Sequence, residues 1–329
     1  MTAAAGESAA PPGRLARVPW RAMAPLLVLA GLCLVLGLVA PNFATTGNFG
    51  RIATSAAVPA VLTIGATLVI LMGGIDLSIE GAMAVAAVAA ALVVVAVPGP
   101  WGAVAGAAAA LATGAALGAT SGLLHVGLRA PSFMITLGMW FIGLGLAIWL
   151  VGGGTVSVRD SELRSLALVR IGGLPLSVWV ALGAVLLAWV VQSRTRFGRA
   201  LYAIGGGEDL AVQSGVPVGR VKIMAFALAG LCYGLGAVLA VAQLGQGNAE
   251  IGEGRLFAAV SAAVVGGTSL LGGHGGVLHS LVGVIIVVVL SNGMILLGVP
   301  PYLQQAVQGL LIIIAVAVSL DRRGQGLVK

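Results

Sequence analysis

The polar side chains of this sequence that could do chemistry are mostly uncharged amides and hydroxyls placed inside apolar segments. Gln304 and Gln308 are four residues apart and therefore share one face of a helix. Such groups could exchange hydrogen bonds with a neutral polyol that crosses a membrane, but helices packed together in lipid use the same groups to bind one another. Both interpretations stay open for the candidate pathway residues Thr136, Asn292, Gln304, Gln305 and Gln308.

The sequence contains none of the spacings that mark common catalytic or cofactor sites. It has no G-x-x-x-x-G-K-[ST] loop, no H-E-x-x-H helix and no G-x-S-x-G elbow, and its three histidines have no cysteine or carboxylate partner at ligand spacing. Cys33 and Cys232 fall in apolar segments, where a thiol usually packs as a small hydrophobic group. We therefore expect a non-enzyme with no catalytic, cofactor-binding or metal-binding residue, so any driving energy must enter through another polypeptide.

Composition indicates the elements that must position these groups. Of 329 residues 59% are hydrophobic and 8% charged, with a mean hydropathy of +1.11, which leaves too little polar surface for a soluble domain. The 51 glycines suit close packing of helices in lipid. A net charge of +7 is better explained by orientation of the helices than by nucleic acid, so no nucleic-acid partner is expected.

The apolar runs predict an all-α integral membrane protein of about ten transmembrane helices, each of about 20 residues. The eighth run is short enough to be a broken or re-entrant helix. The predicted spans are 22–40, 52–72, 77–97, 102–124, 132–151, 175–192, 222–243, 256–271, 276–298 and 302–320.

The distribution of Lys and Arg orients these spans. With the N-terminus inside, twelve of the 17 basic residues are cytoplasmic and five are external, so both termini are predicted to be cytoplasmic. Residues 1–21 are expected to be a disordered cytoplasmic tail rather than a cleaved signal peptide, because the run that follows is long enough to span. The expected organisation is this tail, a permease domain at 22–320 with a cytoplasmic loop at 193–222, and a second cytoplasmic tail at 321–329.

Ionisable side chains are missing from the interior of every predicted span. Asp76, Glu80 and Lys222 all lie close to predicted ends, and a single histidine such as His279 is more often structural than a proton relay. A proton-coupled carrier usually keeps a titrating group at membrane depth, so this class of protein is disfavoured.

Two glycine-rich segments interrupt the apolar pattern. "LMGGIDLSIEGA" at 71–82 and "VVGGTSLLGGHGG" at 264–276 occupy comparable places in the two halves, which is compatible with broken helices in a five-plus-five repeat. Unwound backbone is tolerated at membrane depth where it lines a cavity or is buried in protein. Asp76 and Ser78 could cap the third helix, contact a substrate, or do both.

The predicted cytoplasmic loop is unusually rich in charge. Residues 193–222 carry seven of the 27 charged residues, and Glu208 and Asp209 favour the start of a short helix that Gly215 and Pro217 would end. A helix of about two turns is marginal in water unless another surface packs on it. The apolar side chains that such a surface would cover are Tyr202, Ile204, Leu210 and Val212.

Six motifs in order, spread over residues 25–320, resemble the ribose-type sugar permeases of bacterial ABC importers, in the branched-chain amino acid and monosaccharide permease superfamily. They are "GGIDLS" at 73–78, "PSFMITLGM" at 131–139, "TRFGRALYAIGGGEDLAVQSGV" at 195–216, "RVK" at 220–222, "AVVGGTSLLGGHGGV" at 263–277 and "YLQQAVQGLLIIIAV" at 302–316.

This resemblance implies a multi-pass permease subunit in the bacterial inner membrane that forms the pathway for a monosaccharide. It implies three protein partners: a second permease, usually a copy of the same chain, a cytoplasmic ABC ATPase that binds ATP and Mg, and an external sugar-binding protein. The cytoplasmic loop of the family docks into a cleft of the ATPase. That role carries over to Gly198, Arg199, Tyr202, Ala203, Ile204, Gly205, Gly206, Glu208, Ala211, Ser214 and Gly215.

Two departures from the family pattern fall in this loop. The family commonly reads Gly-Gly-Asn-Glu with a following Ala-Ala, whereas Gly207 stands here in place of the Asn and the segment 209–212 alters the next turn. The first departure predicts a weaker hydrogen bond at the start of the docking helix, and the matching ATPase surface is expected to differ. The sequence does not identify the sugar. Permeases of the same superfamily for branched-chain amino acids, nucleosides or autoinducer-type furanosyl compounds remain alternatives, and a proton-coupled secondary carrier is a more distant one.

Overall fold

The computed structural model describes residues 20–97, 99–159 and 162–321, so the predicted tails fall almost wholly outside the described residues. The all-α prediction is confirmed, and a helix overlaps each of the ten predicted spans. These helices are α1 Trp20–Val39, α2 Thr46–Leu71, α3 Ile79–Ala96, α4 Trp101–Leu128, α5 Ser132–Val151, α7 Leu176–Arg194, α10 Val218–Leu244, α11 Arg255–Val265, α12 Val277–Leu296 and α13 Pro301–Asp321.

Short elements fill three of the connections between these helices. The strands form two antiparallel pairs. β1 pairs with β4, which joins the segment before α7 to the segment after α10, and β2 pairs with β3 just before α7. The shorter elements are β1 Val156–Ser157, η1 Glu162–Arg164, α6 Ser165–Leu168, β2 Arg170–Ile171, β3 Leu174–Pro175, α8 Arg196–Gly206, α9 Glu208–Gln213, β4 Gln246–Gly247 and η2 Ala249–Gly252.

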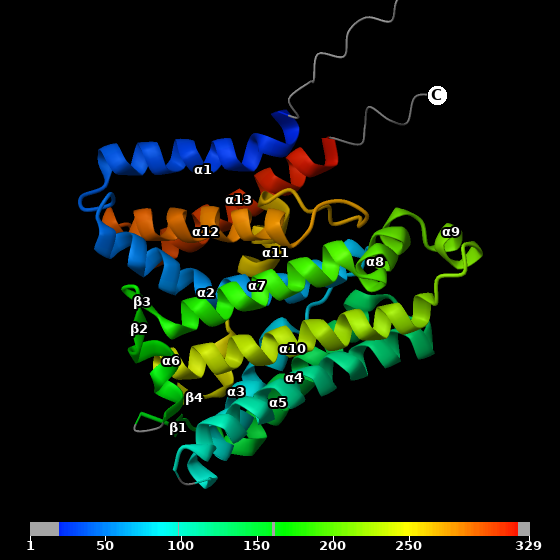
Figure 1. Ribbon diagram of the computed structural model, residues 1–329, viewed down its shortest axis with the longest axis horizontal. Helices are drawn as coiled ribbons and strands as arrows, with labels where there is room; N and C mark the ends of the chain where they lie inside the picture. The colour runs from blue at the N-terminus through cyan, green and yellow to red at the C-terminus, as the bar shows by residue number, and fades with distance from the viewer. Residues whose placement is uncertain (1–19, 98, 160–161, 322–329) are drawn as a thin grey trace, which may run out of the picture.

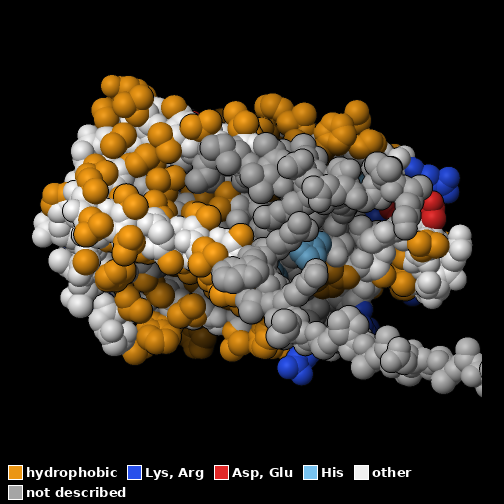
Figure 2. Space-filling view, turned by 90° about the horizontal axis from the view of Figure 1, so that it is seen from above, with side chains coloured by type: hydrophobic (Ala, Val, Ile, Leu, Met, Phe, Trp, Pro, Cys, Tyr) orange, Lys and Arg blue, Asp and Glu red, His pale blue; other side chains and the backbone are white. Residues whose placement is uncertain are grey.

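The long helices run side by side along the longest axis of the molecule (Figure 1). The strands lie at one end, whereas α8, α9, the start of α1 and the end of α13 lie toward the other. Within the described residues, seven helices are long and apolar enough to cross a membrane. In Figure 2, hydrophobic side chains lie along the upper and lower edges of the molecule, and charged side chains gather at the end that holds α8 and α9.

Local signals set several helix ends. The Thr45 hydroxyl accepts a hydrogen bond from the Asn48 amide, so α2 begins at Thr46, six residues before the predicted start at 52. Gly245 ends α10 in the left-handed conformation, which a glycine adopts without steric cost. Hydropathy alone could not have located these ends, because capping depends on single residues.

The glycines of α4 pack inside the chain. A Cβ atom on Gly118 would lie 3.0 Å from the Gly230 Cα, and one on Gly114 would lie 3.0 Å from the Gly234 Cα. Two facing glycine rows therefore bring the backbones of α4 and α10 into contact. This groove is accordingly occupied by α10 and is not a free surface.

Both glycine-rich segments interrupt helices. After α2 ends at Leu71, residues 72–78 are unwound, and α3 begins at Ile79. The eighth predicted span forms a helix of only 11 residues, α11, followed by a glycine-rich loop at 266–276. The principal hydrophobic core gathers buried side chains of α2, α3 and α10, and a second core lies between α1, α2 and α12.

Candidate functional site

Two adjoining cavities lie among α2, α11, α12 and α13. Their volumes are about 380 and 240 Å³, and both are lined by Ala258, Val287 and Gln308. The larger cavity also reaches Phe257 and Gln305, and the smaller reaches parts of α2 and α12. Together they have the size and the largely apolar lining of a small-molecule pocket.

Three predicted pathway residues meet at these cavities. Asn292, Gln305 and Gln308 lie on the walls, and the Gln308 amide donates to the Ser291 hydroxyl at 3.1 Å. Asn292 and Asn48 exchange two hydrogen bonds of 2.9 and 3.0 Å, which tie α12 to α2. The pathway and interhelical interpretations of Asn292 thus both have a structural basis.

Gln304 lies apart from this group. Its amide donates to the Val299 carbonyl at 2.7 Å, at the start of α13. It is not among the residues that line either cavity. The i, i+4 spacing with Gln308 therefore does not bring both side chains to the cavities.

Asp76, Ser78 and Thr136 form a second group, on the unwound segment 72–78 and α5. One Asp76 carboxylate oxygen accepts from the Ser78 amide at 2.8 Å and the Ser78 hydroxyl at 2.6 Å, and the other accepts from the Tyr233 hydroxyl at 2.9 Å. The Thr136 hydroxyl oxygen accepts from the Leu77 amide at 2.9 Å. Ser78 makes no side-chain capping bond to α3, so these contacts fix the unwound segment itself.

Asp76 and Glu80 are buried acids that contact helices from distant parts of the sequence. Tyr233 is near the middle of α10, so its partner Asp76 lies beside the middle of a membrane-length helix, and its side chain is buried. Glu80 is buried as well, and its carboxylate accepts from the Leu256 amide of α11 at 3.1 Å. Hydropathy placed both acids near a helix end, as the structure does, but it could not show that the start of α3 and the unwound segment before it are buried among other helices.

The predicted coupling loop holds two helices, α8 and α9, where one short helix was expected. Leu201 and Ile204 of α8 are buried, so this helix packs firmly on the bundle. On α9 only Ala211 is buried, whereas Leu210 and Val212 are 67% and 57% exposed. The apolar face predicted for the loop is therefore divided between an inward part on α8 and an outward part on α9.

Tyr202 connects α8 to the glycine-rich loop that follows α11. Its hydroxyl donates to the Gly275 carbonyl at 2.6 Å and accepts a short hydrogen bond from the Gln192 amide. The side-chain oxygen Oε1 of Gln192 accepts from the backbone amide of Val277 at 2.7 Å, at the start of α12. Burial raises the pKa of the Tyr202 phenol, so the hydroxyl keeps its proton and remains a donor at neutral pH.

Gly205 of α8 meets both glycine-rich segments. A side chain at this position would overlap the Leu71 carbonyl and the Gly273 amide, and one on Gly272 would lie 2.9 Å from the Gly205 Cα. The Gly273 amide donates to the Leu71 carbonyl at 2.9 Å. The two interruptions, about 200 residues apart in sequence, therefore converge beneath α8 through backbone contacts that only small residues permit.

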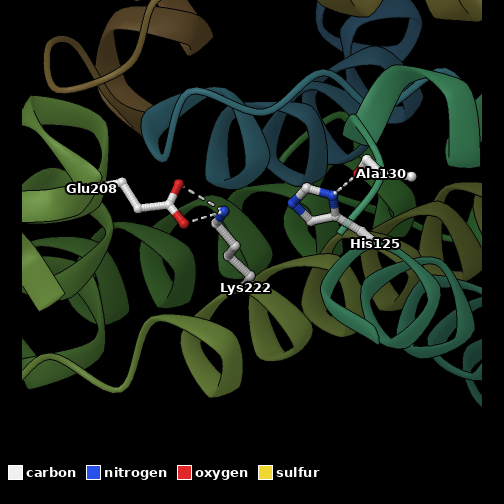
Figure 3. Close-up of polar contacts among 4 residues, drawn as sticks. All are labelled: His125, Ala130, Glu208 and Lys222. Carbon is white, nitrogen blue, oxygen red and sulfur yellow. Dashed lines mark hydrogen bonds and ion pairs between the residues drawn. The ribbon is translucent and has the colours of Figure 1, made fainter. Parts of the chain in front are cut away.

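An ion pair fastens α9 to α10. Both Glu208 carboxylate oxygens lie 2.8 Å from the Lys222 ammonium group (Figure 3). His125, drawn in the same figure, binds the Ala130 carbonyl at 2.6 Å across the turn between α4 and α5. Both contacts are structural connections within the chain. Among the described residues there is no group of three or more His, Cys, Asp or Glu side chains that could hold a metal ion.

Sequence reasoning missed four residues of these networks: Asn48, Glu80, Gln192 and Tyr233. Gln192 carried a usable signal, because it is an amide at the end of an apolar segment, immediately before the charged loop. The partners of the others come from distant segments, so no local pattern could pair them.

Comparison with known proteins decides the family. Residues 48–316 match the family described as "Branched-chain amino acid transport system / permease component". The chain belongs to this family of permease components. The permease is therefore a transport component rather than an enzyme, and its apolar helices make it a multi-pass inner-membrane protein.

Curated relatives cover nearly the whole permease. It is 37% identical over 299 residues to the ribose import permease protein RbsC of Escherichia coli (strain K12), covering 89% of this chain and 92% of the relative. It is 32% identical over 304 residues to the D-allose transport system permease protein AlsC of the same strain, covering 92% of each. The L-arabinose transport system permease protein AraH of that strain is 30% identical over 297 residues, covering 90% of each.

Proposed function

We propose that this chain is the membrane-spanning subunit of an ATP-driven ABC importer and forms the pathway for a monosaccharide of the ribose, allose or arabinose class. The observation that carries the proposal is the lining of the two cavities, which combines apolar side chains with Asn292, Gln305, Gln308 and serine hydroxyls. The relatives named for these sugars support the same substrate class.

The uncharged residues that line the two cavities favour a sugar over an amino acid as the transported substrate. The described residues that line the two cavities include no Asp, Glu, Lys, Arg or His. A zwitterionic amino acid would leave its ammonium and carboxylate groups without charged partners there, which is costly at membrane depth. A sugar presents only hydroxyl groups, and amide side chains can both donate to and accept from these groups.

The α8 and α9 helices are the proposed docking surface for the ATPase. Leu210 and Val212 supply exposed apolar contacts, while Tyr202 and Gly205 face the two glycine-rich segments. Closure of the ATPase domains around ATP and Mg would move α8, and these contacts would carry the movement to α11 and α12. The permease itself supplies the pathway and performs no chemistry.

The same proposal orients the subunit and names its other partners. Described basic residues at the predicted cytoplasmic side support placing α8, α9 and both termini inside the cell. The strand-rich end would then meet the external sugar-binding protein, and a second copy of the chain would complete the pathway. The two glycine-rich interruptions support the five-plus-five repeat. The basic residues that support the cytoplasmic placement of α8 and α9 are Arg129, Arg194, Arg196, Arg199, Arg220 and Lys222.

Substitution of the glutamines tests the pathway. In the complete importer, Gln305→Leu and Gln308→Leu should each raise KM for the transported sugar about tenfold, because a hydroxyl of the sugar would face an apolar group. The matched substitution Gln304→Leu, at a side chain off both linings, should leave KM within about twofold. Unchanged transport in both cavity variants would exclude these cavities from the pathway.

A further inference from the structure

Glu80 is a buried acid that the coupling arrangement does not use. It lies in the first turn of α3, its residue is 6% exposed, and its carboxylate faces the first turn of α11. The Leu256 amide donates to one carboxylate oxygen at 3.1 Å. The acid therefore accepts from a free N–H group in the first turn of α11.

The hydrogen-bond partner of the carboxylate is this backbone amide rather than a basic side chain. Arg255, the basic residue that begins α11, donates from Nε to the Ile251 carbonyl at 2.9 Å. Among the described residues, the acid that forms an ion pair is Glu208, with Lys222, and not Glu80. A buried acid in a membrane-length helix is costly, so its close fit to α11 indicates a function for the contact.

The backbones of the two segments are also in direct contact. A Cβ atom on Gly252, at the end of η2, would lie 3.0 Å from the Glu80 Cα. This approach leaves no room for a side chain at position 252, so the chain entering α11 rests on the start of α3. The Glu80 carboxylate and this backbone contact together fix where α11 begins.

The helix fixed in this way forms a wall of the cavities. Phe257, Ala258 and Ser261 of α11 line the larger cavity, and Ala258 also lines the smaller one. The opposite end of α11 leads into the glycine-rich loop, where Gly273 binds Leu71 and Gly275 accepts from Tyr202. The helix is thus held at its start by Glu80 and at its end by contacts next to α8.

We propose that Glu80 is a positioning residue for transport: its carboxylate fixes the start of α11 and thereby the orientation of the pathway wall. This inference rests on the proposed function for its meaning in transport. The position of α11 can nevertheless be measured without any sugar, so the two claims can fail separately.

A cysteine reporter on α11 tests the proposal in the complete importer. Cys33 and Cys232 are first replaced by alanine, and Ala258→Cys provides one thiol on the wall shared by both cavities. Glu80→Gln and Glu80→Ala are compared in this background, with Glu253→Gln, an exposed acid two residues before α11, as the matched control. The readouts are the labelling rate with a small water-soluble methanethiosulfonate and the KM and Vmax of ribose uptake per inserted permease.

We expect Glu80→Ala to change the labelling rate at least about fivefold and to lower Vmax about tenfold with KM within about twofold. Glu80→Gln should show a smaller change in the same direction, because its amide oxygen still accepts one hydrogen bond. The Glu253→Gln variant should match its parent. Parental labelling and Vmax in Glu80→Ala overturn the proposal, and if that variant fails to insert, parental values in the isosteric Glu80→Gln overturn it equally. If the parent permease itself moves no sugar, altered labelling in Glu80→Ala still supports the role of Glu80, whereas the proposed function is rejected.

Discussion

The Tyr202 hydroxyl of α8 donates to the Gly275 carbonyl at 2.6 Å, which ties the proposed docking helix directly to the loop between α11 and α12. Gln192 extends this tie, because it binds both Tyr202 and the first amide of α12. The helices on either side of the loop line the cavities. A displacement of α8 therefore has a continuous set of contacts through which it can reach the cavity walls.

Removal of the Tyr202 hydroxyl should reduce coupling while leaving the ring packed. In Tyr202→Phe we expect loss of about 1 kcal/mol of stability and a severalfold lower ratio of sugar moved to ATP hydrolysed. Gln192→Ala should lower the same ratio, and the double variant should be less than additive because the residues share one network. The control Tyr302→Phe removes a hydroxyl from a side chain that is 70% exposed, and its ratio should match wild type. Full additivity of the two coupling variants would contradict a shared network.

A methyl group at Gly205 should disturb the convergence of the two glycine-rich segments. Its Cβ would overlap backbone atoms of Leu71 and Gly273, so Gly205→Ala should cost about 1–3 kcal/mol and lower the midpoint of thermal unfolding in detergent. The neighbouring Gly206→Ala is the matched control, because its Cβ would meet no atom within 4 Å. Equal unfolding midpoints for the two variants would show that α8 is not packed against these segments.

Exchange of the Glu208 and Lys222 charges should separate docking from internal support. Glu208→Lys and Lys222→Glu alone each break the ion pair, and we expect uptake to fall severalfold while the permease still inserts. The double exchange restores an ion pair between α9 and α10 and should recover at least about half of the uptake, although such an exposed pair contributes only about 0–1 kcal/mol to stability. A double variant as inactive as Glu208→Lys would instead assign Glu208 a direct contact with the ATPase.

An asparagine at position 207 should stabilise α9. Gly207 precedes the helix without a side-chain capping bond, its φ of 165° is extended, and a Cβ would meet only Leu210 at 3.5 Å. Asn is a favoured N-cap residue, so Gly207→Asn should slow amide hydrogen exchange in 208–213 by up to about fivefold, the equivalent of about 1 kcal/mol. Gly207→Ala supplies a Cβ without a capping group and should give little protection. Faster exchange in the Asn variant would contradict the capping geometry.

The helices were predictable because nearly every span carries a continuous apolar run that a bilayer requires. The predicted start of α2 was late, since Thr45 caps the helix across a segment of mixed polarity. The glycine-rich interruptions were also visible in sequence. Their meeting beneath Gly205 was not, because backbone contacts between segments about 200 residues apart leave no periodic pattern.

The candidate site was only partly accessible for a related reason. The amides of Asn292, Gln305 and Gln308 stood out against apolar neighbours, and the structure brings them to adjoining cavities. The burial of Asp76 and Glu80 could not be predicted, although both lie near the start of α3 as expected, because this helix start and the unwound segment before it are enclosed by other helices. Hydropathy records polarity along the chain, whereas their depth depends on Tyr233 of α10 and the start of α11.

ATP-dependent sugar accumulation in vesicles tests the central claim most directly. The permease is reconstituted with its ABC ATPase, the sugar-binding protein is added outside, and uptake of labelled ribose, allose and arabinose is measured with ATP inside. The account predicts accumulation of at least one of these sugars that requires all three proteins and ATP and that persists with a protonophore. Accumulation by the permease alone that a protonophore abolishes would contradict the account and would identify a proton-coupled carrier.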